Sequence, residues 1–325
     1  TRGSFKCECA AGYTPSSTNR TDCHPVDANI DILISEPYEI RRLRRNSLTQ
    51  ASHYGVLIED QHDASFMSID STNRMVYWID EAIYSINRAH LVPSTFSTTY
   101  PQELLLEDLN HAILPNSIAI DWIGQNLYIG DTEHDCIWVM KNDGRYATKI
   151  ITNIDSPWVV AVNPILGLIY FVNYEYETIN NRTEHVVTIE SASMNGENHQ
   201  ILVDTDLIYP TDLVIDFYQS YRVYWVDEKK ESIESMNFDG TDRLVFAHVG
   251  IHTPHSLDII GSHLYWINRE NQTLFMIDKF GRGVSTLVLD QLESPLFVRI
   301  FHPLKQITTG LEKQKKSSIP LNSYF

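Results

Sequence analysis

A short apolar stretch that ends in Asp recurs along this chain and is the feature that most restricts its fold. Residues 77–80 read YWID and residues 224–227 read YWVD. Weaker copies begin at Tyr128, Tyr170 and Tyr265, so the five tyrosines are separated by 51, 42, 54 and 41 residues. Self-similarity at such a period indicates an architecture of repeated units.

Other landmarks keep register with this motif. A proline precedes four of the tyrosines, and an acid or amide stands six residues after it at Asp121, Asn163 and Asp216, whereas Ile260 breaks the pattern in the next unit. Further along, a hydrophobic residue precedes a turn glycine by seven residues in four units. These glycines are Gly144, Gly196, Gly240 and Gly281. Each unit therefore predicts four strands: one after the proline, the Tyr-Trp strand, a third strand and a short fourth one.

A four-stranded unit of about 40–45 residues is typical of a β-propeller blade. Side chains alternate between the faces of a strand, and both faces of a blade pack on neighbours, so Tyr and Trp can be buried on opposite sides. The closing Asp is expected to accept backbone N–H groups from loops. Five units are complete. We expect an all-β, six-bladed propeller whose last blade combines strands at about 30–60 with one at about 295–301.

Composition excludes several classes of protein. The chain of 325 residues is 43% hydrophobic, enough for a large core, and its formal charge of −17 offers no basic stripe for nucleic acid. The sequence contains no run of about 18 apolar residues that could span a membrane. The acidic surplus favours a basic or metal-bearing partner, or serves solubility alone.

Three of the four cysteines, Cys7, Cys9 and Cys23, crowd the first 25 residues, and Cys136 stands alone. With Gly12 and Tyr13, the cluster resembles the second half of an EGF-like module. That resemblance implies a Cys9–Cys23 disulfide and a partner for Cys7 upstream, in a longer chain. Cys136 is expected to be a buried free thiol, with a disulfide to a neighbouring module as the alternative. An oxidising compartment agrees with three glycosylation acceptors, Asn19, Asn181 and Asn271.

The Tyr-Trp repeat, the proline-led units, the six-blade closure and the EGF-like module together resemble the YWTD propellers of the low-density lipoprotein receptor family, in particular its giant, megalin-like members. The resemblance divides the chain into an EGF-like part (1–25), a propeller (26–305) and a linker or tail (306–325). It implies a non-enzymatic, extracellular part of a cell-surface and endosomal receptor. Such a module binds protein ligands or the receptor's own ligand-binding modules and assists ligand release in acid. It implies no cofactor in this chain and leaves Ca²⁺ open in neighbouring EGF-like and ligand-binding modules.

Binding in that family is usually on the face built by loops after the Tyr-Trp strands and by segments that lead into the inner strands. On this sequence these positions are Glu81, Glu133, Asp135, Tyr174, Glu175, Glu228 and Arg269 for the loops, and Trp158, Tyr209 and Asp212 for the segments. Aromatic rings beside carboxylates suit a Lys- or Arg-bearing ligand. Packing of Trp158 between blades is the alternative.

Histidines in the same regions are candidates for a pH switch, because the unperturbed pKa of histidine, about 6.5, lies between extracellular and endosomal pH. They are His134, His252 and His255. Ordinary surface histidines without coupling to binding are the alternative. The third unit is also ten residues longer than its neighbours around 175–186, which predicts a projecting hairpin with a glycan at Asn181, for partner contact or as decoration.

A second function class is a secreted six-bladed hydrolase or lactonase with a metal at the channel mouth. Asn116, Asp212 and Asp258 are its candidate ligands, yet they stand one, two and four residues after their prolines, which argues against convergence. The sequence shows no Gly-rich phosphate loop, zinc spacing or Ser elbow. We therefore expect no metal and no catalytic residue.

Overall fold

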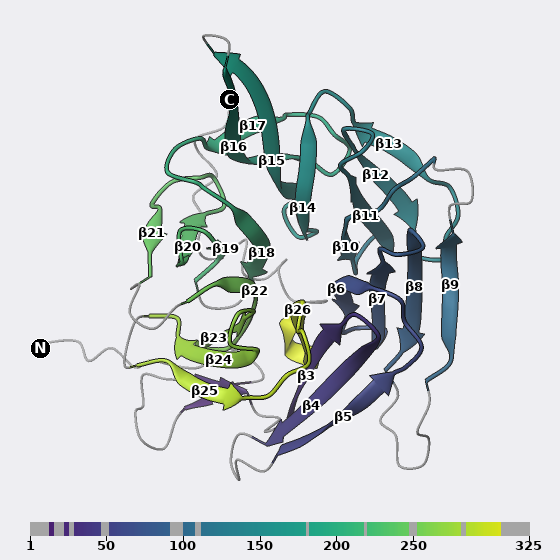
Figure 1. Cartoon of the computed structure of the whole chain (residues 1–325), viewed down its shortest axis with the longest axis vertical. Coiled ribbons are helices and arrows are strands. Elements are labelled where there is room, and N and C mark those ends of the chain that lie inside the picture. Colours follow the sequence, from purple (N-terminus) through teal and green to yellow (C-terminus); the bar gives the residue numbers. More distant parts are fainter. Residues whose placement is uncertain are drawn as a thin grey trace, which may run out of the picture.

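The protein is represented by a computed structural model, which describes residues 13–15, 23–25, 29–46, 52–91, 100–107, 112–179, 182–217, 220–246, 252–280 and 284–306. Six four-stranded antiparallel sheets surround a central axis, which confirms the six-bladed propeller (Figure 1). A separate two-stranded sheet pairs β1 (Tyr13–Pro15) with β2 (Cys23–Pro25). The EGF-like module, the domain boundaries and the Cys9–Cys23 disulfide stay predictions, and Cys7, Cys9 and Asn19 lie outside the described residues.

Each blade runs from an inner strand beside the axis to an outer strand at the rim (Figure 1). Blade 1 comprises β6 (Ala64–Asp70), β7 (Met75–Asp80), β8 (Ser85–His90) and β9 (Gln102–Glu107). Blade 2 comprises β10 (Ser117–Asp121), β11 (Asn126–Asp131), β12 (Cys136–Lys141) and β13 (Thr148–Ile151). Blade 3 comprises β14 (Ser156–Asn163), β15 (Leu168–Ile179), β16 (Arg182–Ser193) and β17 (Gln200–Val203).

The remaining blades follow the same order. Blade 4 comprises β18 (Pro210–Asp216), β19 (Arg222–Asp227), β20 (Ser232–Asn237) and β21 (Leu244–Val245). Blade 5 comprises β22 (Pro254–Ile260), β23 (His263–Asn268), β24 (Thr273–Asp278) and β25 (Thr286–Leu289). Blade 6 comprises β26 (Phe297–Phe301), β3 (Asn29–Glu36), β4 (Glu39–Asn46) and β5 (Ser52–Ile58), and a 3-10 helix, η1 (Pro303–Lys305), follows β26.

The Tyr-Trp pairs are buried on opposite sides of their strands, as expected. In blade 4, Tyr224 packs in a cluster with Leu257 and Trp266 of blade 5, whereas Trp225 belongs to the large cluster that continues toward blades 1 to 3. In blade 5 the order repeats, because Tyr265 packs in the cluster of blade 6. Each Tyr-Trp strand therefore joins two interfaces between blades, which explains why the pair recurs.

The closing Asp of the motif accepts backbone N–H groups from neighbouring loops, which confirms the role predicted for it. Asp227 is fully buried, and its carboxylate accepts from the backbone N–H groups of Ile208 at 2.7 Å and Tyr209 at 2.9 Å. Asp80 and Asp131 accept in the same way from the segments that precede their inner strands. The motif thus fixes the loops at one face of the ring.

The turn at Ile260 explains why this unit lacks the acid found in the others. Asp121 caps a longer turn by accepting from the N–H groups of Ile123 and Gly124 at 2.9 and 2.8 Å. In blade 5, Ile260 pairs directly with His263, so only two residues form the turn. A two-residue hairpin leaves no such N–H groups for an acid to bind.

Arginines of β4 attach the closing blade to its neighbours. Arg42 Nη1 donates to the Tyr100 hydroxyl of blade 1 at 3.2 Å, and Arg45 Nη1 donates to the Met276 sulfur of blade 5 at 3.1 Å. Because β26 and β3 come from opposite ends of the propeller segment, these contacts add to the strand pairing that closes the ring.

Two third strands carry a buried glutamate at equivalent positions. In blade 4, Glu234 accepts from Lys230 Nζ at 2.8 Å and from Arg243 Nε at 2.7 Å. In blade 3, Glu190 is equally buried, and its carboxylate contacts the imidazole of His199, which follows it by the same nine residues. A side chain that is charged only when protonated therefore replaces a permanent cation.

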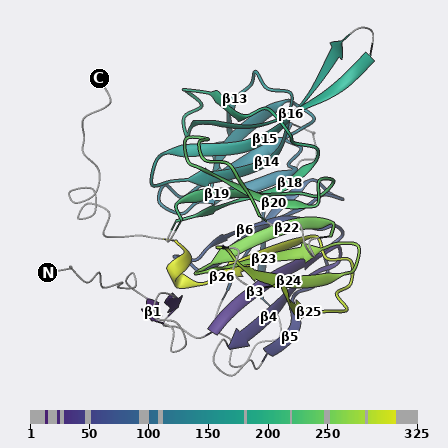
Figure 2. The same ribbon diagram turned by 90° about the vertical axis from the view of Figure 1, so that its left-hand side faces the viewer.

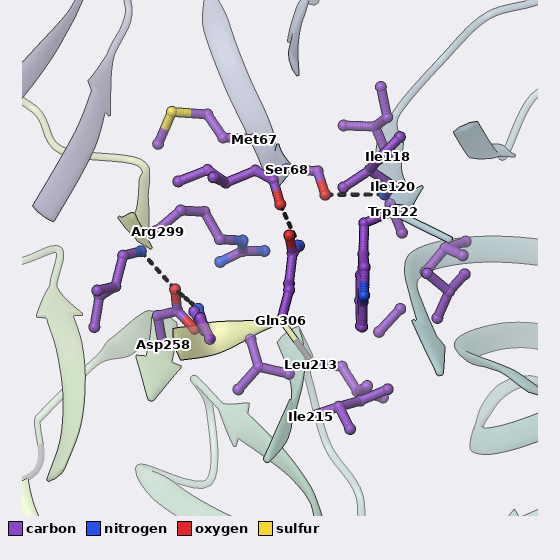
Figure 3. A pocket seen from close by; sticks show the side chains of 18 of the residues that line it. Met67, Ser68, Ile118, Ile120, Trp122, Leu213, Ile215, Asp258, Arg299 and Gln306 are labelled. Atoms are coloured by element: carbon purple, nitrogen blue, oxygen red, sulfur yellow. Dashed lines mark hydrogen bonds and ion pairs between the residues drawn. The ribbon is translucent and has the colours of Figure 1, made fainter. Parts of the chain in front are cut away.

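The axial cavity is small and mostly apolar, with a volume of about 100 Å³, and Gln306 reaches into it (Figure 3). The Gln306 side chain donates to the Ile69 carbonyl at 2.5 Å and accepts from the Ser71 N–H at 2.6 Å. Lys305 forms an ion pair with the buried Asp258. Gln306 is the first residue of the segment expected to be a linker or tail. These contacts lie where the inner strands end.

Candidate functional site

The ring has two distinct faces. Inner strands β14, β18 and β22 begin on one face, and β15 and β16 project from it; we call it the hairpin face. Helix η1 lies on the opposite face, which we call the helix face (Figure 2). The loops and segments predicted for binding belong to the hairpin face.

An aromatic groove of about 540 Å³ lies on the hairpin face between blades 3 and 4. Its walls are Ser156, Trp158, Tyr174, Val187, Leu207, Ile208 and Tyr209. The ring centroids of Trp158 and Tyr174 are 6.3 Å apart in an edge-to-face arrangement, and those of Tyr174 and Tyr209 are 5.8 Å apart. Trp158 is half-buried, so it both packs between blades and borders the groove.

Tyr174 holds the groove in shape. Its side chain is buried, and its hydroxyl donates to the Pro210 carbonyl of the next blade at 3.0 Å. Tyr209 is half-buried beside it, and burial raises the pKa of its phenol, an effect that the Glu228 carboxylate increases. Ile208 at the rim leaves 55% of its surface exposed. The groove is therefore preformed and open to a ligand.

His255 and Glu228 form a hydrogen-bonded pair next to this groove. His255 Nδ1 lies 2.6 Å from Glu228 Oε2, and both side chains are largely buried. The hydrogen bond to His255 lowers the pKa of Glu228 below its usual range, against the effect of burial. Arg269 adds a favourable charge to Glu228 and also to Glu81 of blade 1, so the loops of three blades interact here.

The structure does not gather the three candidate histidines in one cluster. His134 Nδ1 lies 2.9 Å from the fully buried Asp131 in blade 2. His255 is the second residue of β22 in blade 5. His252 precedes this strand and is exposed, 3.7 Å from Glu231. Of the three, His255 is the histidine that contacts a residue beside the groove.

The other predicted positions are spread over the same face. Glu133 and Asp135 are exposed in the loop after β11, and partial desolvation together with the negative charge of Asp155 raises the pKa of Asp135. Glu175 is half-buried and accepts from Asn173 Nδ2 at 3.1 Å. Acidic side chains therefore lie in loops of blades 2 and 3 on this face.

Asp212 lies inside the ring, where no ligand on the hairpin face reaches it. Its carboxylate is fully buried and receives two bonds from Arg299, Nη1 at 2.7 Å and Nη2 at 2.8 Å. Ser256 Oγ donates to it at 2.6 Å and Leu257 N–H at 3.0 Å. We therefore leave Asp212 out of the candidate binding surface.

The metal ligands of the hydrolase alternative are likewise occupied. Asp258 pairs with Lys305 and accepts from the Ile300 N–H at 2.6 Å, and Asn116 Nδ2 donates to the Trp158 carbonyl at 2.7 Å. Within the ranges described above, no group of three or more His, Cys, Asp or Glu side chains is arranged to hold a metal. The arrangement does not favour a metal-dependent enzyme.

The remaining predicted sites have simple outcomes. Cys136 is a buried free thiol, and burial raises its pKa. Asn271 is exposed in the turn before β24, whereas Asn181 lies outside the described residues. No described segment forms a helix with the length and apolarity needed to cross a membrane.

Comparison with known proteins identifies relatives of this chain. It is 30% identical over 284 residues to low-density lipoprotein receptor-related protein 5 of Mus musculus. This alignment covers 85% of the chain and 16% of the relative. It is 32% identical over 208 residues to the vitellogenin receptor of Solenopsis invicta. This alignment covers 64% of the chain and 11% of that receptor. These relatives are members of the low-density lipoprotein receptor family, and the chain belongs to that family. The chain thus spans about a tenth to a sixth of their length.

Structural comparison agrees on the fold. A chain in the crystal structure of a nidogen/laminin complex superposes with a TM-score of 0.70 at 20% identity, over 84% of this chain and 99% of that one. At this identity the likeness concerns the fold alone. No family model matches the chain. The megalin-like assignment stays a prediction.

Proposed function

We propose that this chain is an extracellular, non-catalytic module of a receptor and that it binds protein ligands in the aromatic groove of the hairpin face. The groove is the observation that carries the proposal. Relatives of the chain are named as receptors, and the glycosylation acceptors and the cysteine cluster suit an extracellular location. Other modules of the same receptor are a second class of partner for this surface.

The chemistry of the groove selects for an aromatic or aliphatic anchor beside a cation. Trp158 and Tyr209 offer ring faces, and rigid aromatic side chains in a preformed pocket are frequent binding hot spots. Glu175 and Glu228 place carboxylates nearby, which favours a Lys or Arg in the ligand.

Acid-dependent release follows from His255 in this proposal. Because Glu228 has a lowered pKa, it stays ionised near pH 5.5, and protonation of the imidazole turns an anionic site into a neutral ion pair. A cationic ligand then loses attraction. This release requires that ligand binding and imidazole protonation are linked.

Selection of displayed random peptides of about 12 residues on the intact chain tests the binding surface. We expect Trp158→Ala and Tyr209→Ala each to weaken the selected peptides by about tenfold or more. Tyr146→Ala is the matched control, because that ring is 81% exposed in the turn between β12 and β13, on the helix face. Charge reversal at Glu175 should weaken the binding of the basic peptides.

Two outcomes contradict the proposal. Peptides whose affinity is unchanged by Trp158→Ala and Tyr209→Ala would place binding elsewhere, and a selection without enriched peptides would remove the evidence for a peptide site. For the acid response, the combined replacement of His134, His252 and His255 should flatten the change in affinity between about pH 7.4 and 5.5. An unaltered pH dependence rejects these histidines as the switch.

A further inference from the structure

The lengthened hairpin of blade 3 is a two-stranded ribbon with open edges. Strands β15 and β16 pair without interruption from Leu168–Ser193 to Ile179–Arg182. Strand β14 pairs with β15 only as far as Tyr174, and β17 pairs with β16 only from Ile189. We call residues 175–179 and 182–188 the ribbon. Figure 2 shows it leaving the body of the propeller.

Beyond Glu175, the outer side of each ribbon strand carries backbone N–H and C=O groups that pair with no other strand in the described part of the chain. Such an edge is a template for another strand, and proteins usually protect it with charged side chains, above all Lys, or with Pro or a bulge. Residues 174–188 read YEYETINNRTEHVVT, rich in strand-forming residues and without Lys, Pro or Gly. The ribbon pairing also contains no bulge. Its charged residues are mostly acidic, so the edge remains suited to a strand that carries basic side chains.

One of the two edges adjoins the aromatic groove. The last residue of β15 to pair with β14 is Tyr174, opposite Ser156, and both line the groove. Beyond this point the position that β14 would occupy is empty of strands among the described residues. A strand added along residues 176–179 would continue the line of β14 and end near Ser156, at the groove.

We propose that an extended segment of a protein ligand pairs with the β15 edge at residues 176–179 and inserts an apolar side chain into the groove. This inference rests on the proposed function and specifies how the ligand is held: main-chain hydrogen bonds supply affinity and the groove supplies specificity. The two contacts are adjacent, so one short segment can make both.

The charge of the edge defines the chemistry of that segment. Glu175 lies at the start of the edge, and Asp155 is exposed just before β14. A strand with Lys or Arg at alternate positions meets these acids favourably. A second copy of the chain fits poorly, because each copy carries the same acids and a net charge of −17.

Ribbon removal separates the edge from the groove. Replacement of residues 176–185 by Asn-Gly joins Glu175 to Val186, which are register partners, through a turn suited to a two-residue hairpin. Every groove residue is kept. Peptides selected on the intact chain should bind this variant about tenfold or more weakly, and they should slow amide exchange at residues 175–179 of the intact chain.

Each outcome decides the proposal. Peptides that bind the shortened variant equally well, yet are lost with Trp158→Ala, overturn strand addition and leave the groove as the site. Unchanged exchange at residues 175–179 overturns strand addition even if the shortened variant does not fold, since that measurement uses the intact chain. Dimerisation that disappears with the ribbon would assign the edge to a second copy and likewise overturn it. A selection without enriched peptides overturns both proposals.

Discussion

Substitution of Arg299 by Met tests how the inner strands are held together. Arg299 lies on β26, and its guanidinium makes two bonds to Asp212 on β18. Ser256 of β22 donates to the same carboxylate, so three consecutive inner strands meet at one buried anion. Methionine has a similar length and fills much of the same volume, so the substitution removes the charge with little loss of packing.

The expected cost is large because Asp212 is fully buried and Arg299 exposes only 13% of its side chain. Removal of one partner of a buried ion pair costs about 3–5 kcal/mol, since the remaining charge has no counter-ion. The three surviving donors, Ser256 Oγ and the N–H groups of Leu213 and Leu257, favour the lower end of that range. At about 2–4 °C per kcal/mol for a domain of this size, the melting temperature should fall by about 10 °C.

Thermal and denaturant unfolding of wild type, Arg299→Met, Asp212→Asn and the double variant measure this directly. The double variant should be about 1–3 kcal/mol more stable than the two single costs predict by addition. Arg145→Met is the control, because this arginine pairs with Asp143 at the surface and should leave the melting temperature unchanged. The reasoning is refuted if Arg299→Met costs less than about 1 kcal/mol, or if the two costs simply add.

Three further predictions concern turns and ion pairs. Gly196→Ala should cost about 3 kcal/mol in the free energy of unfolding, because φ is +86° and a Cβ would lie 2.0 Å from a backbone oxygen. Gly167→Ala is the control and should cost about 1 kcal/mol, because the space around Gly167 is open. Equal costs would contradict the close approach at Gly196. His199→Arg should stabilise the protein by about 1 kcal/mol near pH 8 and less near pH 5.5, because it supplies Glu190 with a permanent cation. If unfolding measurements show the same gain at both pH values, this cause is excluded. The lowered pKa of Glu228 contributes stability above its ordinary pKa of 4.5 that is lost as the pH falls through the folded-state value, so the melting temperature of Glu228→Gln should decline less in that acidic range than that of wild type.

The fold could be predicted because its determinants are local. Tyr224 and Trp225 alternate by strand geometry, and Asp227 binds backbone groups close to its own turn, so their roles follow from the motif. Gly144 and Gly196 have φ near +85°, as the predicted turns require. The sequence could not show that both glycines also press against the outer strand of the preceding blade, since that contact depends on how blades stack.

The candidate site was harder to predict because bulges change the direction of side chains. The pairing of β18 with β19 shifts between Pro210 and Asp212, and comparable shifts follow Pro157 and Pro254. An extra residue reverses the alternation after it, so counting from the proline misplaces Asp212, which is buried in the ring. The partner Arg299 is 87 residues away, and no local pattern in the sequence connects the two.

The way in which blade 6 closes also decides how the propeller bears mechanical load. The first residues of β3 and the last residues of β26 pair at Asp31–Phe301 on the helix face, so a pull on the two strands would open their ladder one pair at a time from that point. Lys305 and Gln306 lie beyond Phe301 and attach to blades 5 and 1 instead of to β3. Force on the chain after β26 would therefore reach these two neighbours before it reached the closing strands, and the ring would share the load across three blades.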